Sequence, residues 1–305
     1  MSRIANSVEV FVLAHTQLEP GFYEYLDEYD RVWPSGYDKG EPSTAQLVLG
    51  EDWMRGRPGE ALAEFAGRQC YDSFGGSGAG AGRKTNASYI KHIIEVGHGS
   101  VLEHASMTIL VKGASRGFTH EQVRHRVGTA YSQGSTRYCD GNKFRFVMPS
   151  LVKQLEREAE ALGDEALLDE AVTLRGCYEL AHNRHMENYR ECLERTQALA
   201  QVLLADRFDA SSRSDKTALT KTVRSCARAL LPIGTEAPIV ITQNYRQWRT
   251  ALVQRGSEAA ELEIREVYIK CLEILQERAP HVFGDFEVFR AKDGTLACRT
   301  EYPKV

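Results

Sequence analysis

The segment RHRVGTAYSQGSTRY, residues Arg124–Tyr138, combines residue types that could hold an anion. Four of its fifteen residues can carry positive charge and none can carry negative charge. Glycines let backbone N–H groups approach a ligand, hydroxyl groups add donors, and guanidinium groups bind phosphate through paired hydrogen bonds. No acid in the segment can neutralise Arg124, Arg126 or Arg137, so the pattern favours an anion-binding loop over surface ion pairs.

Two later stretches supply further arginines. CARALLP contains Arg228, and NYRQWRTALVQRG contains Arg246, Arg249 and Arg255. Arginines of residues 152–206 lie among many acids, so there we expect ordinary surface pairs.

Three other patterns invite a catalytic or metal-binding interpretation that their spacing does not support. In HEQVRH, His120 and His125 are five residues apart and would point about 140° apart on a helix. His182 and His185 share a helix face without a placed third ligand, so an exposed histidine pair is expected. Cys139 has no partner base, which favours an inert thiol. The sequence therefore predicts no metal site.

The glycine-rich stretch FGGSGAGAGRKT, residues Phe74–Thr85, resembles a phosphate loop only superficially. That motif requires G-x-x-x-x-G-K-[ST] after a strand, whereas here Arg83 takes the lysine position and a helix comes before it. We expect a flexible loop between two helices.

Composition narrows the class of protein. The 305 residues carry a formal net charge of -4, which argues against a general nucleic-acid binder. The seven cysteines form no CxxC pair, as expected of reduced thiols in the cytoplasm. We find no signal peptide and no run of about 18 apolar residues, so no membrane association is expected.

The elements that must position these residues follow from apolar periodicity and turn signals. Residues 16–58 are expected to be irregular. The helix expected after them, over Pro58–Tyr71, has Leu62, Phe65 and Ala66 at helical spacing. The last turn of a helix over Ser115–Arg126 is expected to carry arginines. Strands are expected over Val8–His15, Ser106–Gly113 and Thr235–Asn244, and further helices over Pro58–Tyr71, Ala87–Gly97, 151–206, Lys216–Pro232 and Glu258–Pro280.

These elements indicate a mixed α/β (α+β) protein with a central sheet and flanking helices. No repeat or clean linker divides the chain, so we expect one domain over residues 1–305. Its long helical insertion would cover about residues 151–215.

Three blocks then resemble one family, the flavin-dependent thymidylate synthases (ThyX). GHGSVLEHASMTILVKGASR is similar to the family's G-H-x-S-x-x-E-H block before a strand. HEQVRHR followed by YSQGSTRY resembles its RHR signature with a later Ser and Arg-Tyr. CARALLP and ITQNYRQW…QRG resemble its C-terminal block. The likeness covers roughly residues 60–150 and 215–285.

The resemblance implies a homotetramer with active sites at subunit interfaces. It also implies FAD, a uridine monophosphate nucleotide, methylenetetrahydrofolate, and NADPH as reductant of the flavin. Residues expected at FAD are His98, Ser100, Glu103, Arg124, His125, Arg126, Gln133, Asn244 and Arg246. Residues expected at the nucleotide are Glu121, Arg124, Gln133, Ser135, Thr136, Arg137, Arg228 and Arg255, of which Arg255, Arg137 and Ser135 are placed nearest the chemistry.

The implied chemistry is reductive methylation at C5 of uracil, a poor nucleophile until electron density is pushed into the ring. The family uses no covalent cysteine adduct and relies on the flavin for carbon and hydride transfer. A cationic donor such as Arg255 would stabilise charge developing on the uracil. Ser135 is expected to donate to phosphate rather than to act as a nucleophile.

The chain departs from the family pattern near Thr129 and Ala130. Eight residues separate RHR from Ser135, where the pattern has seven. Thr250 and Ala259 occupy positions that can carry flavin-side polar groups in relatives. Because the extra residue near Thr129 and Ala130 lies beside the expected nucleotide site, we expect UMP as substrate, as in the family branch that serves peptidyl-nucleoside antibiotic biosynthesis, which this chain resembles.

Three alternatives stay open at this point. The chain could be an ordinary dUMP enzyme, or a flavin- or nucleotide-binding paralogue without methyl transfer. An RNA uridine methylase is disfavoured, because the acidic net charge does not suit many phosphate contacts.

Overall fold

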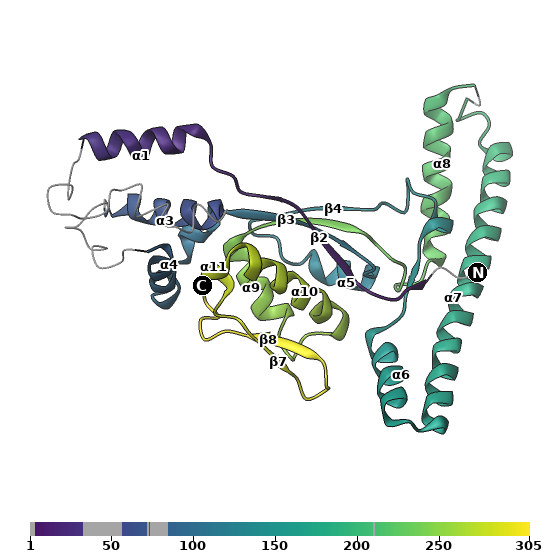
Figure 1. The fold of residues 1–305 in the computed structure, drawn as a ribbon. Helices are drawn as coiled ribbons and strands as arrows, with labels where there is room; N and C mark the ends of the chain where they lie inside the picture. The colour runs from purple at the N-terminus through teal and green to yellow at the C-terminus, as the bar shows by residue number, and fades with distance from the viewer. Residues whose placement is uncertain (1–3, 33–56, 72, 74–84, 210) are drawn as a thin grey trace. The chain divides into compact units, whose positions relative to one another are not determined.

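The computed structural model describes residues 4–32, 57–71, 73, 85–209 and 211–305 (Figure 1). Contacts within the chain define two compact units. The first unit contains residues 1–9, 111–123 and 132–239, and the second contains residues 10–110, 124–131 and 240–305. The glycine-rich stretch 74–84, expected to form a loop, lies outside the described residues.

A four-stranded sheet has the strand order β2–β3–β6–β4. Its strands are β2 (Glu9–His15), β3 (Ser106–Lys112), β4 (Thr129–Gln133) and β6 (Ile239–Asn244). Alternate residues of β3 and β6 are buried, including Met107, Ile109 and Ile241. The opposite face is polar in part, because the hydroxyl oxygens of Thr108 and Thr242 lie 2.9 Å apart. The predicted strands over Val8–His15 and Ser106–Gly113 are confirmed as β2 and β3. The strand predicted over Thr235–Asn244 is confirmed only from Ile239, because Thr235 and Glu236 make isolated bridges instead.

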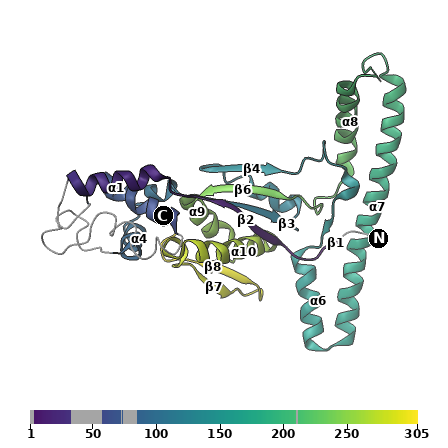
Figure 2. The same ribbon diagram turned by 45° about the horizontal axis from the view of Figure 1, so that its top comes forward.

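Helices of the second unit cover one face of this sheet (Figure 2). They are α9 (Tyr245–Arg255) and α10 (Leu262–Arg278), and the short α11 (Pro280–Phe283) that follows contacts α10 and α4. The indole N–H of the buried Trp248 donates to the backbone oxygen of Met107, which joins α9 to β3. The helix predicted over Glu258–Pro280 is confirmed from Leu262 to Arg278, and one side of it is buried at Val267, Tyr268, Cys271, Leu272 and Leu275.

Three elements of the second unit escaped the sequence analysis. Helix α9 was missed because its polar and apolar residues form no clear stripe. Strands β7 (Glu287–Arg290) and β8 (Leu296–Arg299) form an antiparallel hairpin near the C-terminus. The hairpin was missed because its strands have only four residues each.

Helices α1 (Pro20–Val32), α3 (Pro58–Cys70) and α4 (Asn86–Glu95) lie in the second unit. The expectation of irregular structure was wrong for residues 20–32, where Pro20 opens a helix and Leu26 is buried. The helix predicted over Pro58–Tyr71 is confirmed as α3, and its Leu62 and Phe65 are half-buried. Phe65 contacts Phe22 of α1, with ring centroids 5.0 Å apart.

The first unit contains the long helices of the predicted insertion. Helix α7 (Glu165–Leu203) lies beside α6 (Ser150–Leu162) along one part of its length and beside α8 (Arg213–Ala227) along another (Figure 1). Met186 and Tyr189 of α7 pack against Ala227. The unit also includes α5 (Arg116–Gln122), the pair β1 (Ile4–Ala5) and β5 (Phe146–Val147), and the 3-10 turns Gly141–Lys143 and Arg228–Leu230.

The expectation of an exposed histidine pair on α7 was wrong for His182. Its ring is buried and stacks on Phe146, with centroids 4.9 Å apart, whereas His185 is exposed. Burial lowers the pKa of His182, and the charges of His185 and Arg190 act in the same direction. His182 is therefore a packing residue of the first unit.

Candidate functional site

A pocket of about 260 Å³ in the second unit contains three of the predicted cofactor residues. His98, Ser100 and Arg246 line it, together with α3 residues around Gly67 and Cys70. His98 comes directly before the 3-10 turn Gly99–Glu103, and Arg246 lies in the first turn of α9. Residues about 150 positions apart in sequence therefore meet at one pocket.

Two further cofactor candidates set the geometry of this end of α9. Arg246 donates from Nη1 to Oε1 of Glu103 at 2.6 Å, and both side chains are partly exposed. Asn244 is the N-cap of α9, where its Oδ1 accepts from the backbone N–H of Gln247 at 2.8 Å. The cap fixes the start of the helix and hence the position of Arg246.

The arginines of the RHR signature lie beyond α5, not in its last turn as predicted. Helix α5 ends at Gln122, and Arg124 and Arg126 follow in the turn that leads to β4. Both side chains are exposed and make no ion pair within the described part of the chain. Two cations without carboxylate partners remain available to an anionic ligand.

His125, between these arginines, is buried and contacts Arg255 at the end of α9. Nε–H of Arg255 donates to Nε2 of His125 at 2.9 Å. Because the guanidinium stays protonated, His125 must be neutral with its own proton on Nδ1. Burial lowers the pKa of His125, and the charge of Arg255 lowers it further. The structure thus joins a residue predicted at the cofactor with one predicted at the nucleotide.

The expected loop after Arg126 is in fact partly a strand, because Thr129–Gln133 form β4. Gly128 turns the chain into that strand with φ of +60°. Its backbone oxygen accepts from the N–H of Asn244 at 3.1 Å, and the Tyr131 hydroxyl donates to the backbone oxygen of His125 at 2.5 Å. These contacts hold the RHR turn against the start of α9.

We expect Gly128→Ala to lower the free energy of unfolding by about 2–4 kcal/mol. The left-handed backbone costs about 1 kcal/mol for alanine, and repacking around the new methyl adds to it. A Cβ at residue 128 would lie 2.4 Å from Nδ2 of Asn244. Urea unfolding measures the change. Gly163→Ala is the matched control, since Gly163 has φ of +68° with nothing within 4 Å of a Cβ. Equal losses would show that the Asn244 contact does not matter.

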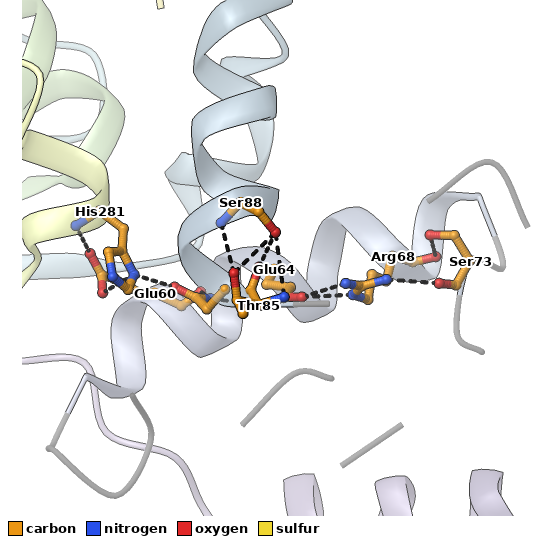
Figure 3. Close-up of polar contacts among 8 residues, drawn as sticks. Glu60, Glu64, Arg68, Ser73, Thr85, Ser88 and His281 are labelled. Atoms are coloured by element: carbon orange, nitrogen blue, oxygen red, sulfur yellow. Dashed lines mark hydrogen bonds and ion pairs between the residues drawn. The ribbon is translucent and has the colours of Figure 1, made fainter. Parts of the chain in front are cut away.

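Buried charged groups of α3 support one wall of the pocket (Figure 3). Nε of Arg68 donates to Oε1 of Glu64 at 2.8 Å, and Asn86 donates to Oε2 of Glu64 at 2.8 Å. One turn earlier, Oε1 of Glu60 accepts the backbone N–H groups of His281 and Val282. Glu60, Glu64 and Arg68 are each at most 1% exposed. The network ties α3 to α4 and α11, and sequence periodicity did not reveal it because all its charges lie inside.

In the first unit, Ser135, Thr136 and Arg137 form a turn after β4. The backbone oxygen of Ser135 accepts from the N–H groups of Tyr138 and Cys139, and its Oγ accepts from the N–H of Arg137. Thr136 is buried, whereas the Arg137 side chain is exposed and without an ion pair to the described residues. The turn presents a hydroxyl and a guanidinium together, as a phosphate site requires.

Gln133 and Arg228 complete the described geometry of the first unit. Nε2 of Gln133 donates to the Thr119 hydroxyl at 2.9 Å, and Glu121 lies on the same helix, α5. Arg228 is exposed at the end of α8. Burial lowers the pKa of Arg116, and the nearby charge of Arg228 lowers it further. Arg116 is a site candidate that the sequence analysis missed, although it ends the first of the blocks quoted above.

Further features bear on alternative chemistries. Within the described residues, no cluster of three or more His, Cys, Asp or Glu could hold a metal ion. All seven cysteines are free. Burial raises the pKa of Cys271 and of Cys298 to about 12, so neither is an activated thiolate. No helix in the described ranges is both long and apolar enough to cross a membrane.

Thr250 and Ala259, the two departures near the flavin-side block, have ordinary environments. The Thr250 hydroxyl donates to the backbone oxygen of Arg246 at 3.1 Å within α9. Ala259 is exposed in the turn that follows α9. Neither residue lines the pocket around His98.

Comparison with known proteins places this geometry in context. Residues 54–281 match the family described as "Thymidylate synthase complementing protein". The flavin-dependent thymidylate synthase of Mycobacterium sp. (strain JLS) is 42% identical over 243 residues, which cover 79% of this chain and 85% of the relative. The enzyme of Mycobacterium avium (strain 104) is 43% identical over 237 residues, covering 78% and 83%. That of Corynebacterium efficiens is 39% identical over 243 residues, covering 80% and 86%.

Proposed function

The chain belongs to the family of flavin-dependent thymidylate synthases, and from that premise we propose that it methylates uracil C5 of a uridine monophosphate nucleotide. Methylenetetrahydrofolate would donate the carbon and NADPH would supply the reducing equivalents. The observation that carries this proposal is the set of arginines without carboxylate partners. Within the described residues, Arg124, Arg126 and Arg137 are exposed and unpaired where the sequence predicts anionic ligands.

The residues of the second unit fit a flavin dinucleotide, whose diphosphate needs cationic and N–H donors. Arg124 and Arg126 provide unpaired charge, and the pocket beside His98 offers the hydroxyl of Ser100 and the guanidinium of Arg246. The set that would hold the cofactor is His98, Ser100, Glu103, Arg124, His125, Arg126, Asn244 and Arg246, with Gln133. When bound, the flavin would supply hydride and one-carbon transfer.

The remaining residues would bind and polarise the nucleotide. Ser135, Thr136 and Arg137 would hold its phosphate together with Arg228, and Arg116 would add charge beside Arg228. Glu121, Gln133 and Arg124 would complete the set. Arg255 would stabilise negative charge developing on the uracil as C5 attacks. His125 fixes the direction of the Arg255 guanidinium by accepting its Nε–H.

We further propose UMP rather than dUMP as the preferred substrate. The extra residue of the signature falls at the start of β4, a strand that leads directly into the Ser135–Arg137 turn. Thr129 and Ala130 therefore set the position of the turn expected to hold the nucleotide. Turnover of UMP and dUMP by purified protein with methylenetetrahydrofolate, FAD and NADPH, with products identified by mass, tests both proposals. A strong dUMP preference would end the UMP assignment, and absence of methylated product would end the enzymatic one.

Deletion of Ala130 is expected to shift the ratio of UMP to dUMP turnover at least several-fold. Removing one residue from a strand reverses the faces of the residues on one side of it, which displaces the contact between the Tyr131 hydroxyl and His125. Deletion of Thr129 should act in the same direction. Replacement of Thr129 by valine is the control, because it keeps the residue count. An unchanged ratio in both deletions would separate the inserted residue from substrate choice.

One rival activity makes a different prediction. A paralogue that only binds flavin or nucleotide would show flavin absorbance without methylated product.

We also propose a homotetramer with active sites at subunit interfaces, which the mass of the holoenzyme in solution tests. The seven free cysteines suit the reducing cytoplasm, where we place the protein.

A further inference from the structure

A basic groove runs along one face of α8 in the first unit. Arg213, Lys216, Thr217, Thr220, Lys221 and Arg224 recur at intervals of three, one, three, one and three residues, which places them on one side of the helix. Together with Arg137 and Tyr138 they line a groove of about 320 Å³. Five of its eight lining residues are cationic and none is acidic, so the groove suits an anion.

Within the described part of the chain, none of the five cations of this groove makes an ion pair. One acid lies near the groove: hydrogen bonds from Ser211 lower the pKa of Asp209, and the charge of Lys216 lowers it further. Lys221 and Arg224 instead hold Tyr138: the Lys221 ammonium lies 4.5 Å from its ring centroid, and Nη1 of Arg224 donates to its backbone oxygen at 2.5 Å. Helix α7 next to it behaves differently, because Arg175 and Arg195 pair with glutamates. Unpaired cations gathered in a hollow are a binding feature rather than general solubilising charge.

The length of the groove exceeds what one phosphate can use. Arg213 and Arg224 are eleven residues apart, which corresponds to about 16 Å along a helix. The nucleotide phosphate would occupy only the end formed by Arg137. The remaining cations therefore face a ligand that carries several anionic groups in a row.

We propose that this groove binds the polyanionic segment of a cosubstrate, a proposal that rests on the proposed function. Two cosubstrates offer such chemistry: the phosphates of NADPH, and the carboxylates of a glutamyl tail on methylenetetrahydrofolate. The hydroxyl groups of Thr217 and Thr220 already donate to the backbone oxygens of Arg213 and Lys216 within α8, so the cationic side chains supply the donors to the ligand. The exposed ring of Tyr138 adds a stacking surface at the end of the groove next to Arg137.

The test neutralises the end of the groove that is distant from Arg137. In the flavin-loaded enzyme, Arg213→Gln/Lys216→Gln is compared with Arg157→Gln/Arg184→Gln, which removes equal charge from exposed positions of α6 and α7. One arm compares kcat/KM for NADPH with that for NADH. The other compares triglutamyl with monoglutamyl methylenetetrahydrofolate. Calorimetric titration with inorganic tripolyphosphate gives a readout independent of turnover.

We expect one of the two preference ratios to fall roughly five- to tenfold at low salt, and the affected arm identifies the ligand. The effect should shrink with added salt, and the KM for the nucleotide should not change. If both preference ratios and tripolyphosphate binding are unchanged in the groove variant, the groove proposal is overturned. Methylation by the wild-type enzyme would in that case still support the proposed function. If the wild type makes no methylated product, the proposed function fails, and the tripolyphosphate titration alone decides whether the groove binds polyanions.

Discussion

Arg255→Ala is expected to lower kcat by about 10²- to 10³-fold, because it removes a donor aimed at developing negative charge. In the folded protein the same guanidinium donates through Nε to the buried His125. Its loss removes a nearby positive charge, so the pKa of His125 should rise toward its ordinary value while burial still holds it down. Steady-state kinetics measure the first effect, and NMR titration of the His125 ring measures the second.

The matched variants separate charge from orientation. Arg255→Lys keeps a positive charge but lacks the Nε–H that contacts His125. We expect it to recover part of kcat and to keep the pKa of His125 low. Arg278→Ala, at an exposed position near the end of α10, is the control for loss of an arginine from this unit. Full activity in Arg255→Ala, with flavin bound, would remove Arg255 from the chemistry.

The sequence predicted the regular elements of this protein well where periodicity was strong. The strand predicted over Val8–His15 follows from its β-branched and aromatic residues, and α10 follows from its apolar spacing. The path after α5 did not follow from apolar spacing, because Gly128 at positive φ and a backbone hydrogen bond from Asn244 to Gly128 turn the chain there. For the same reason the helix predicted over Ser115–Arg126 is longer than the observed α5.

The sequence pointed to the candidate site residues one by one, but not to the contacts between their side chains. Motif spacing pointed to His125 and Arg255, yet nothing in the sequence shows that one accepts a hydrogen bond from the other. Arg116 was missed because its role depends on the nearby charge of Arg228. Such relations arise from packing between segments about 110 to 130 residues apart.

A second large effect concerns stability and comes from the buried pair on α3. Arg68→Met should lower the free energy of unfolding by about 3–5 kcal/mol, because it leaves Glu64 buried without its cation. Arg195→Met is a close control: Glu191 and Arg195 have the same spacing and order on a helix, but both are exposed. There we expect a loss of at most about 0.5 kcal/mol. Urea unfolding of both variants measures the difference, and similar small losses would show that burial of the pair does not matter.

The stability contributed by Glu64 should also depend on pH in a defined direction. Burial raises the pKa of Glu64 from 4.5 to about 7, against the opposing effects of Arg68 and Asn86. Between these values the folded protein keeps a proton that the unfolded chain releases, so this contribution is fully present below about pH 4.5 and is lost as pH rises through about 7. Arg68→Met removes a group that lowers this pKa, so its destabilisation should grow as pH rises through about 7. The side chain introduced by Glu64→Gln cannot titrate, so the free energy of unfolding of this variant should depend less on pH. If it varies with pH as steeply as in the wild type, another group controls the pH dependence.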